Sequence, residues 1–154
     1  MTDGRLSPEL PDETEVMKAF RASLPLRITE HPEEIGALSL AYLGDTVYEL
    51  YNRILTVSHG DRPVEKLHRE SIERAKAVTQ SKLVDVLAEE FTDGEQAVYR
   101  RGRNANVHTK AKNASVQEYH RATGLEAVIG YLYLKGETGR LEYLLKKGFD
   151  ALGL

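Results

Sequence analysis

Apolar residues recur at intervals of three and four through most of the chain after residue 31, and no segment alternates apolar and polar residues with a period of two. The clearest stripe comprises Leu40, Leu43, Val47, Leu50 and Ile54. Such spacing places side chains on one face of an α-helix, whereas a half-buried strand needs alternation. The 154 residues therefore predict an all-α fold with one domain and no internal repeats.

Capping and breaking residues divide this pattern into separate helices. We expect helices at about 32–58, 64–91, 93–100, 115–134 and 139–151. Asp93 with Gln96, and Ser115 with Glu118, resemble capping boxes, which mark helix starts. The polar Thr-Gln-Ser segment at 79–81 marks the break if residues 64–91 form two helices instead of one.

The first 30 residues differ in composition from the remainder. Five acids against Arg5 give residues 1–15 a charge of −4, so the rest of the chain carries +1 of the total of −3. Glycine and proline among these acids predict a flexible tail, which a short helix at 15–23 follows. We therefore divide the chain into an acidic, partly disordered extension at 1–30 and a folded domain at 31–154.

Several classes of protein are excluded by composition. The absence of Cys excludes disulfides and thiolate chemistry and fits a reducing cytoplasm. The N-terminus lacks the apolar run of a signal peptide, and no stretch approaches the roughly 18 apolar residues of a membrane span. His68 and His108 have no partner at a ligand-like spacing, so zinc is not expected. No phosphate-binding or dinucleotide fingerprint is present. We expect a cytoplasmic protein with no membrane segment and no small-molecule cofactor.

Two acids lie inside apolar helical segments beside glycines. Asp45 follows Gly44, and Glu126 lies between Gly124 and Gly130 in the most apolar part of the chain. Small residues let helices pack closely, so the two acids are expected to meet at one helix contact. Neighbouring buried carboxylates repel one another. A divalent cation between them removes the repulsion and receives the oxygen ligands that Mg²⁺ prefers.

Simpler explanations of these acids stay open on spacing alone. A mid-helix carboxylate is most often solvated, or it accepts a hydrogen bond or pairs with an Arg. Glu49, one turn after Asp45, extends an acidic face or pairs with Arg53 four residues later.

A basic segment without acids extends from Tyr99 to Asn113. Residues 102–114 lack an apolar period and predict a loop. Arginine binds phosphate oxygens bidentately, and neutral side chains add donors. A solvated loop is an equal alternative on charge alone. The candidate nucleic-acid contacts are Arg100, Arg101, Arg103, Asn104, His108, Lys110 and Lys112.

Two segments resemble the ribonuclease III family. LAYLGDTVYELY at 40–51 is similar to the signature helix of that family, whose centre is Leu-Gly-Asp, and ATGLEAVIGYLYL at 122–134 is similar to its second acidic helix. The resemblance covers roughly 33–150. It is closest to the short bacterial branch, Mini-ribonuclease III, which lacks the double-stranded-RNA-binding domain. The segments most similar to that branch are KLHRES at 66–71, RRGRNA at 100–105 and residues 112–136.

The resemblance implies a helical, homodimeric ribonuclease III endonuclease domain. Asp45 and Glu126 fall on the catalytic acids that bind Mg²⁺, for which Mn²⁺ is able to substitute. Larger family members have acids where this chain has Ala41 and Thr123, which leaves the number of metal ions open. The implied substrate is double-stranded RNA, in particular the precursor of large-subunit (23S) ribosomal RNA. The implied products carry 5′-phosphate and 3′-hydroxyl ends.

Two functions without catalysis remain as alternatives. In the first, the missing acids at Ala41 and Thr123 leave a catalytically idle double-stranded-RNA-binding or ribosome-assembly protein. In the second, Asp45 and Glu126 are structural and the chain is a helical interaction protein. Mg²⁺-dependent cleavage of a duplex distinguishes the nuclease from the first, and failure to bind duplex RNA at low salt favours the second.

Overall fold

The computed structural model describes residues 15, 18–19, 31–105 and 115–154. No strand occurs in this part of the chain, so the predicted all-α fold is confirmed. The tail at 1–13 and most of the helix expected at 15–23 lie outside the described residues. The main helices are α2 (Ala37–Ser58), α3 (Val64–Ala75), α4 (Ala77–Leu87), α5 (Asp93–Asn104), α6 (Val116–Leu134) and α7 (Thr138–Leu152), with short 3-10 turns η1 (Pro32–Glu34) and η2 (Ala88–Glu90).

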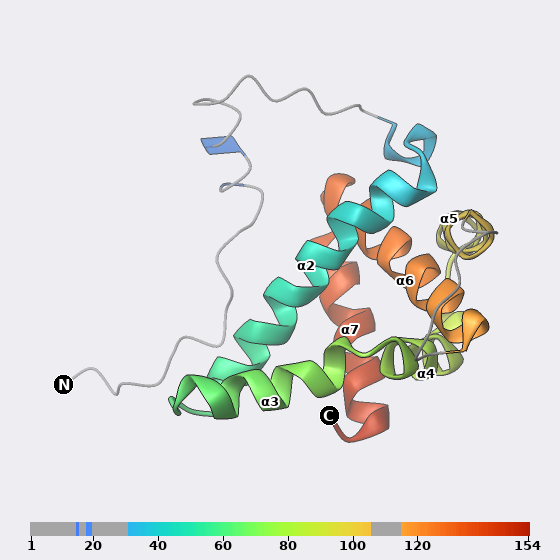
Figure 1. The fold of residues 1–154 in the computed structure, drawn as a ribbon. Coiled ribbons are helices and arrows are strands. Elements are labelled where there is room, and N and C mark those ends of the chain that lie inside the picture. The colour runs from blue at the N-terminus through green and yellow to red at the C-terminus, as the bar shows by residue number, and fades with distance from the viewer. Residues whose placement is uncertain (1–14, 16–17, 20–30, 106–114) are drawn as a thin grey trace.

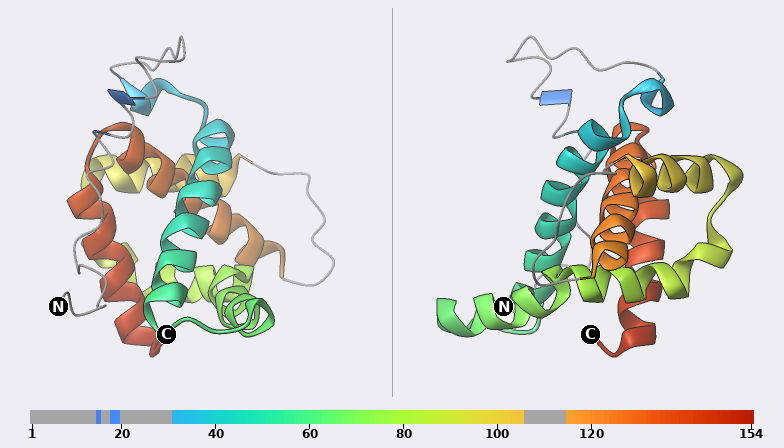
Figure 2. Two further views of the ribbon diagram at one scale, coloured as in Figure 1. Left: turned by 90° about the vertical axis from the view of Figure 1, so that its left-hand side faces the viewer. Right: turned by 45° about the vertical axis from the view of Figure 1, so that its right-hand side comes forward.

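Helix α6 lies at the centre of the fold, between α2 and α5 and against α4 and α7 (Figure 1, Figure 2). Ten of its 19 residues are buried, which is typical of a helix that packs on several sides. Its Leu125, Val128 and Leu132 share the core with Leu40 of α2 and Leu83 of α4. Burial of each such side chain contributes about 1.5–3 kcal/mol. None of the described helices is long and apolar enough to cross a membrane.

The first helix begins later than the sequence predicts. Pro32 begins only the 3-10 turn η1. Ile35 is then extended, with ψ of 140°, and Gly36 precedes the first residue of α2. The expected helix at 32–58 is therefore a short turn followed by α2.

The segment at 64–91 is two helices, but the break lies at Lys76 instead of at 79–81. Lys76 has an extended conformation, with φ of −62° and ψ of 141°. The polar residues after the break bind the carbonyls that it frees at the end of α3. Thr79 Oγ1 donates to the Glu73 carbonyl at 2.6 Å, and Gln80 Nε2 donates to the Ala75 carbonyl at 3.5 Å.

The next capping box is displaced by one residue from the expected Asp93 and Gln96. Thr92 Oγ1 accepts from the Glu95 main-chain N at 3.2 Å, and the Thr92 N donates to Glu95 Oε1 at 3.1 Å. The start at Ser115 is confirmed, since its hydroxyl accepts from the Glu118 N at 3.1 Å.

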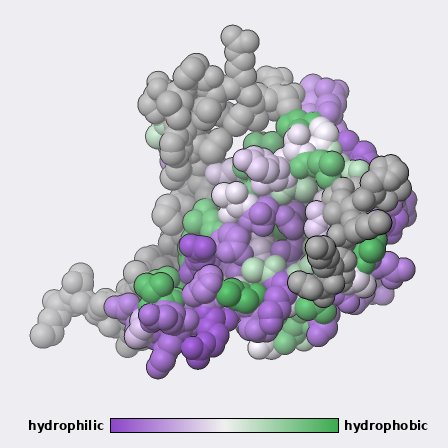
Figure 3. Space-filling view, viewed as in Figure 1, coloured by the Kyte–Doolittle hydropathy of each residue, from purple (hydrophilic) through white to green (hydrophobic). Residues whose placement is uncertain are grey.

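The apolar stripe predicted for α2 faces the core only in part. Leu40 and Val47 are buried, whereas Leu50 is 48% exposed. The buried face also includes Gly44 and Tyr48, which the stripe omits. The contact face is centred on Gly44 because α6 crosses α2 there. Figure 3 shows that polar residues dominate the surface over α3, with apolar residues scattered among them.

Candidate active site

Helices α2 and α6 meet at two glycines. A Cβ added to Gly44 would lie 1.7 Å from the main-chain O of Glu126, and one added to Gly130 would lie 2.1 Å from the main-chain O of Leu40. Carbon and oxygen atoms that are not bonded to each other rarely approach closer than about 3.3 Å. Glycine at both positions therefore allows the two backbones to touch.

This contact brings Asp45 and Glu126 together, as the sequence predicted. Asp45 is exposed and directly follows Gly44, while Glu126 is half-buried. Burial raises the pKa of Glu126 to about 8, and the charge of Asp45 and a hydrogen bond between the two carboxyl groups add to this effect. Because two carboxyl groups this close do not both ionise readily, the pair retains a proton at neutral pH when no cation is bound.

The two acids fit a hard divalent cation. Their oxygens are the ligands that Mg²⁺ prefers, and a cation would displace the shared proton. In the described ranges, no three His, Asp or Glu side chains are grouped so that they could hold one metal ion. The protein would thus supply two carboxylate ligands, and water or substrate would occupy the other positions.

The positions at which larger family members have additional acids are occupied by buried residues. Ala41 is 6% exposed and Thr123 is 8% exposed. Thr123 Oγ1 donates to the Tyr119 carbonyl of its own helix at 3.0 Å. Neither residue supplies a charged ligand, so the negative charge at the helix contact comes from Asp45 and Glu126.

Glu49 forms the predicted pair with Arg53, with its Oε2 3.6 Å from Arg53 Nε. Asn52 Nδ2 also donates to Glu49 Oε1 at 3.3 Å. The negative charge of Glu49 nevertheless contributes to raising the pKa of Glu126. Glu49 therefore adds negative potential to the site.

A buried polar cluster behind α2 was missed by sequence reasoning. The guanidinium of Arg74, which is 3% exposed, donates to Asn52 Oδ1 at 3.1 Å, Thr56 Oγ1 at 2.9 Å and Glu70 Oε2 at 3.1 Å. The hydroxyl of Tyr48 donates to the Arg74 carbonyl at 2.5 Å. The cluster holds α3 against α2, and it begins one turn after Asp45. The one sequence feature that could have indicated this cluster was the spacing of four between Tyr48, Asn52 and Thr56.

The basic segment remains helical through Asn104, although the sequence predicted a loop from residue 102. The last turns of α5 include Gly102, whose added Cβ would lie 2.8 Å from the Cβ of Ala127 and 3.0 Å from the Cα of Gly124. This packing against α6 extends the helix beyond the expected end at residue 100. The predicted contacts on this part of α5 are Arg100, Arg101, Arg103 and Asn104. The others, His108, Lys110 and Lys112, lie outside the described residues.

The arginines of α5 have different surroundings. Arg100 is exposed. The guanidinium of Arg103 lies 5.6 Å from the centre of the Tyr99 ring, and its Nε donates to Asn104 Oδ1 at 3.3 Å. Arg101 donates instead to main-chain carbonyls before α2. Charge and spacing alone did not distinguish these three side chains.

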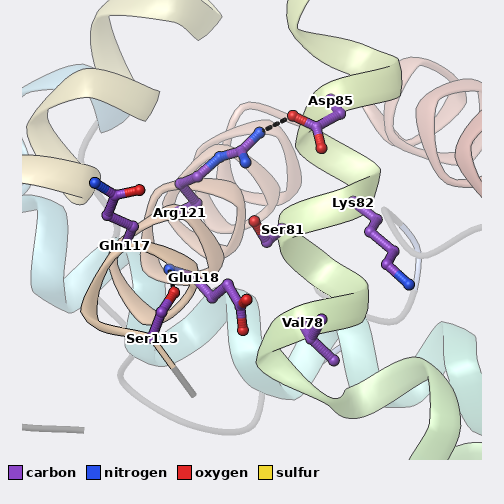
Figure 4. Close-up of a pocket in the computed structure, with 8 residues that line it drawn as sticks. All are labelled: Val78, Ser81, Lys82, Asp85, Ser115, Gln117, Glu118 and Arg121. Carbon is purple, nitrogen blue, oxygen red and sulfur yellow. Dashed lines mark hydrogen bonds and ion pairs between the residues drawn. The ribbon is translucent and has the colours of Figure 1, made fainter.

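A separate cavity of about 250 Å³ lies between α4 and the first turns of α6 (Figure 4). Neither acid of the pair lines it. Its arginine, Arg121, forms an ion pair with Asp85 within the cavity. The lining residues are Val78, Ser81, Lys82, Asp85, Ser115, Gln117, Glu118 and Arg121.

An all-helical domain that pairs two acids at a crossing of glycine-containing helices agrees with the class of protein that the sequence resemblance implies, a helical nuclease of the ribonuclease III kind. The family model described as the ribonuclease III domain matches residues 38–137. The chain therefore belongs to the ribonuclease III family, and it is a ribonuclease III-type endoribonuclease.

Its relatives specify the branch of the family. The Mini-ribonuclease 3 of Clostridium tetani is 44% identical over 115 residues, which span 74% of this chain and 76% of the relative. The Mini-ribonuclease 3 of Staphylococcus aureus is 43% identical over 119 residues, which span 76% and 89%. The crystal structure of protein FN1578 from Fusobacterium nucleatum has the same fold, with a TM-score of 0.72 at 24% identity over 80% of this chain and 98% of that chain. The resemblance to the Mini branch is thus confirmed.

Proposed function

We propose that this chain hydrolyses double-stranded RNA in a divalent-metal-dependent reaction, with Asp45 and Glu126 as the catalytic residues and metal ligands. The observation that supports this proposal is the proximity of the Asp45 and Glu126 carboxyl groups at the glycine contact of α2 and α6. Mg²⁺ is the expected cation, and Mn²⁺ is expected to substitute. When bound, such a cation activates a water molecule and neutralises the charge that develops on the phosphate.

Each residue of the proposed site has a separate role. Asp45 is exposed and therefore faces the side from which a phosphodiester approaches. Glu126 is half-buried and releases its proton when the cation binds. The contact between Gly44 and Gly130 holds the two acids in place, and the charge of Glu49 favours a cation over an anion at the site.

We propose that the chain acts as a homodimer joined in part through α2. Four large apolar side chains are exposed on one side of this helix, and an apolar patch of this kind marks an association surface. Two copies would present two acid pairs to the two strands of a duplex. Tyr42→Ala is expected to shift the protein toward the monomer in sedimentation experiments, whereas Val64→Ala, at an apolar residue of α3 that is 76% exposed, should not. The four residues are Leu38, Tyr42, Leu50 and Val57, of which Tyr42 is 85% exposed.

We propose that the basic segment binds RNA phosphates. A-form RNA is recognised mainly through shape, phosphates and 2′-hydroxyl groups, so binding is expected to weaken steeply with salt and to depend little on sequence. Arg101 is left out of this set because its guanidinium already donates to main-chain carbonyls. The proposed contacts are Arg100, Arg103, Asn104, His108, Lys110 and Lys112.

The biological substrate that we propose is the double-stranded stalk of precursor 23S ribosomal RNA, cut to leave 5′-phosphate and 3′-hydroxyl ends. The similarity to Mini-ribonuclease 3 proteins supports this assignment. The cytoplasm, where this precursor is transcribed, is the compartment that such a substrate implies.

The decisive experiment replaces Asp45 with Asn and measures cleavage of a duplex RNA with and without Mg²⁺. Loss of a direct ligand is expected to lower the rate by more than the roughly 100-fold that loss of an outer-shell partner costs. In EDTA, the variant should unfold no more easily than wild type, because one of two repelling acids has been neutralised. Asp61→Asn, on an exposed loop, is the matched control. A folded Asp45→Asn protein that cuts as fast as this control would refute the proposal.

A catalytically idle RNA-binding protein is the second candidate. The uncharged residues Ala41 and Thr123 favour it, because they leave the site with two acids. It predicts that the wild-type protein binds duplex RNA but does not cut it in Mg²⁺ or Mn²⁺.

A further inference from the structure

Arg101 is attached to the segment that precedes α2. Its Nη2 donates to the Glu33 carbonyl at 2.7 Å, and its Nη1 donates to the Ile35 carbonyl at 3.5 Å. These bonds join residues 66 and 68 positions apart. The planar guanidinium has donors spaced to bind two acceptors at once, which an ammonium group does not reproduce.

The residue after Arg101 fixes the same turn of α5 to α6. Gly102 packs against Gly124 and Ala127, and Ala127 directly follows Glu126. One turn further along α6, Gly130 packs against the carbonyl of Leu40 in the first turn of α2. The end of α5 is thus joined to α6 through Gly102 and, through Arg101, to the carbonyls of Glu33 and Ile35 just before α2.

Together, these three contacts connect α2, α5 and α6 to one another near the acid pair. The contact at Gly44 and Gly130 sets the separation of α2 and α6 at one crossing point. Helices α2 and α6 share an extensive contact, and an attachment at the N-terminal end of α2 further restrains the orientation of this helix. Arg101 supplies this attachment where the chain enters α2, and Asp45 lies only about 12 Å along the helix from Ala37 at a rise of about 1.5 Å per residue.

We propose that Arg101 is a positioning residue for the candidate active site, which holds the start of α2 against α5 and thereby keeps Asp45 facing Glu126. This assignment rests on the proposed function of the acid pair. It gives Arg101 a role different from that of Arg100, its exposed neighbour, although both belong to one basic segment. A phosphate contact by Arg101 is the alternative that the experiment must exclude.

The test compares Arg101→Ala and Arg101→Lys with Arg100→Ala, and uses Lys146→Ala, at an exposed position of α7, as the neutral control. Three experiments are made: the salt dependence of duplex-RNA binding in EDTA, steady-state kinetics for kcat and KM in Mg²⁺, and electron paramagnetic resonance for the affinity for Mn²⁺ alone. Arg101→Ala is expected to lower kcat about tenfold and to weaken Mn²⁺ binding, with an unchanged salt slope. Arg100→Ala is expected to raise KM and to reduce the slope by about one, the effect of one lost phosphate contact.

The lysine variant separates charge from geometry. Because Lys keeps the charge but not the paired donors, Arg101→Lys should resemble Arg101→Ala in kcat and Mn²⁺ affinity. A reduced salt slope in Arg101→Ala that Lys restores, with kcat and Mn²⁺ affinity retained, would overturn the positioning role. If wild type cuts no RNA, the proposed function fails, and unchanged Mn²⁺ affinity in Arg101→Ala would still refute the role of Arg101 separately.

Discussion

Replacement of Gly44 by Ala tests whether the backbone contact of α2 and α6 creates the acid pair. The new Cβ would lie 1.7 Å from the carbonyl O of Glu126, 2.7 Å from its carbonyl C and 2.8 Å from the N of Gly130. All three atoms belong to the backbone and cannot rotate away. To reach an ordinary carbon–oxygen distance of about 3.3 Å, the helices must separate by roughly 1.5 Å at this point.

The expected loss of stability exceeds that of ordinary overpacking. Extra methyl groups in packed cores cost about 1–3 kcal/mol when side chains adjust. Because only backbone can move here, we expect Gly44→Ala to lower the free energy of unfolding by about 3 kcal/mol or more. At about 2–4 °C per kcal/mol for a domain of this size, Tm would fall by roughly 6–12 °C. Separation of the helices would also draw Asp45 away from Glu126 and weaken stabilisation by Mn²⁺.

The control is the same substitution at Gly139 in the first turn of α7, where an added Cβ would meet nothing within 4 Å. Gly139→Ala should raise stability by about 0.4–1 kcal/mol, because alanine restricts the unfolded chain. Urea unfolding in EDTA and in Mn²⁺ measures both effects. If Gly44→Ala is as stable as Gly139→Ala and gains as much from Mn²⁺, the close contact does not create the site.

Three further predictions follow from ionisable groups. In EDTA, the contribution of Glu126 to the free energy of unfolding should be fully present below about pH 4.5 and be lost toward pH 8, by at most about 5 kcal/mol, because the pKa of Glu126 is raised from 4.5 to about 8 in the folded state. Urea titrations should show that Glu126→Gln removes this decline. Burial alone would raise the pKa of Glu70, but hydrogen bonds from Arg74, Arg62 and His59 lower it to about 2. Its stabilisation, on the order of 1–2 kcal/mol after screening, should be present above about pH 4.5 and lost as the pH falls toward 2, and acid unfolding of Glu70→Gln should lack this loss. Arg74→Met should lower the free energy of unfolding, measured in urea, by about 3–5 kcal/mol, because the substitution leaves Glu70 and buried oxygens without their donor. The loss should be smaller when Glu70→Gln is already present.

The helices were predictable because their signals are local. Apolar spacing and the Ser115 cap gave the limits of α6, and α7 extends only one residue beyond its expected range at each end. The errors had both distant and local causes. Packing of Gly102 against α6 extends α5, and the break at Lys76 is stabilised by side chains that bind the end of the preceding helix.

The acid pair was predictable for a similar reason. Asp45 and Glu126 each lie beside glycines in an otherwise apolar helix, and this pattern is visible within ten residues. The bonds of Arg74 and Arg101 join residues far apart in the chain, and an arginine that will be buried is indistinguishable in sequence from a solvated one. The sequence therefore indicated which acids meet, but not which arginines hold the helices on which these acids lie.

The glycines of α6 explain how the fold tolerates an acid whose pKa is raised so far. Gly124 packs against Tyr99 of α5, and Gly130 packs against α2. At about 100° per residue, six residues of separation place these glycines on different faces of α6, with Glu126 between them along the helix. Because α6 packs closely on both neighbours, its backbone at Glu126 is held near Asp45, and a proton or a cation relieves the repulsion between the two carboxyl groups. The close packing that stabilises the core is thus the same feature that prepares the carboxyl pair to exchange its proton for a metal ion.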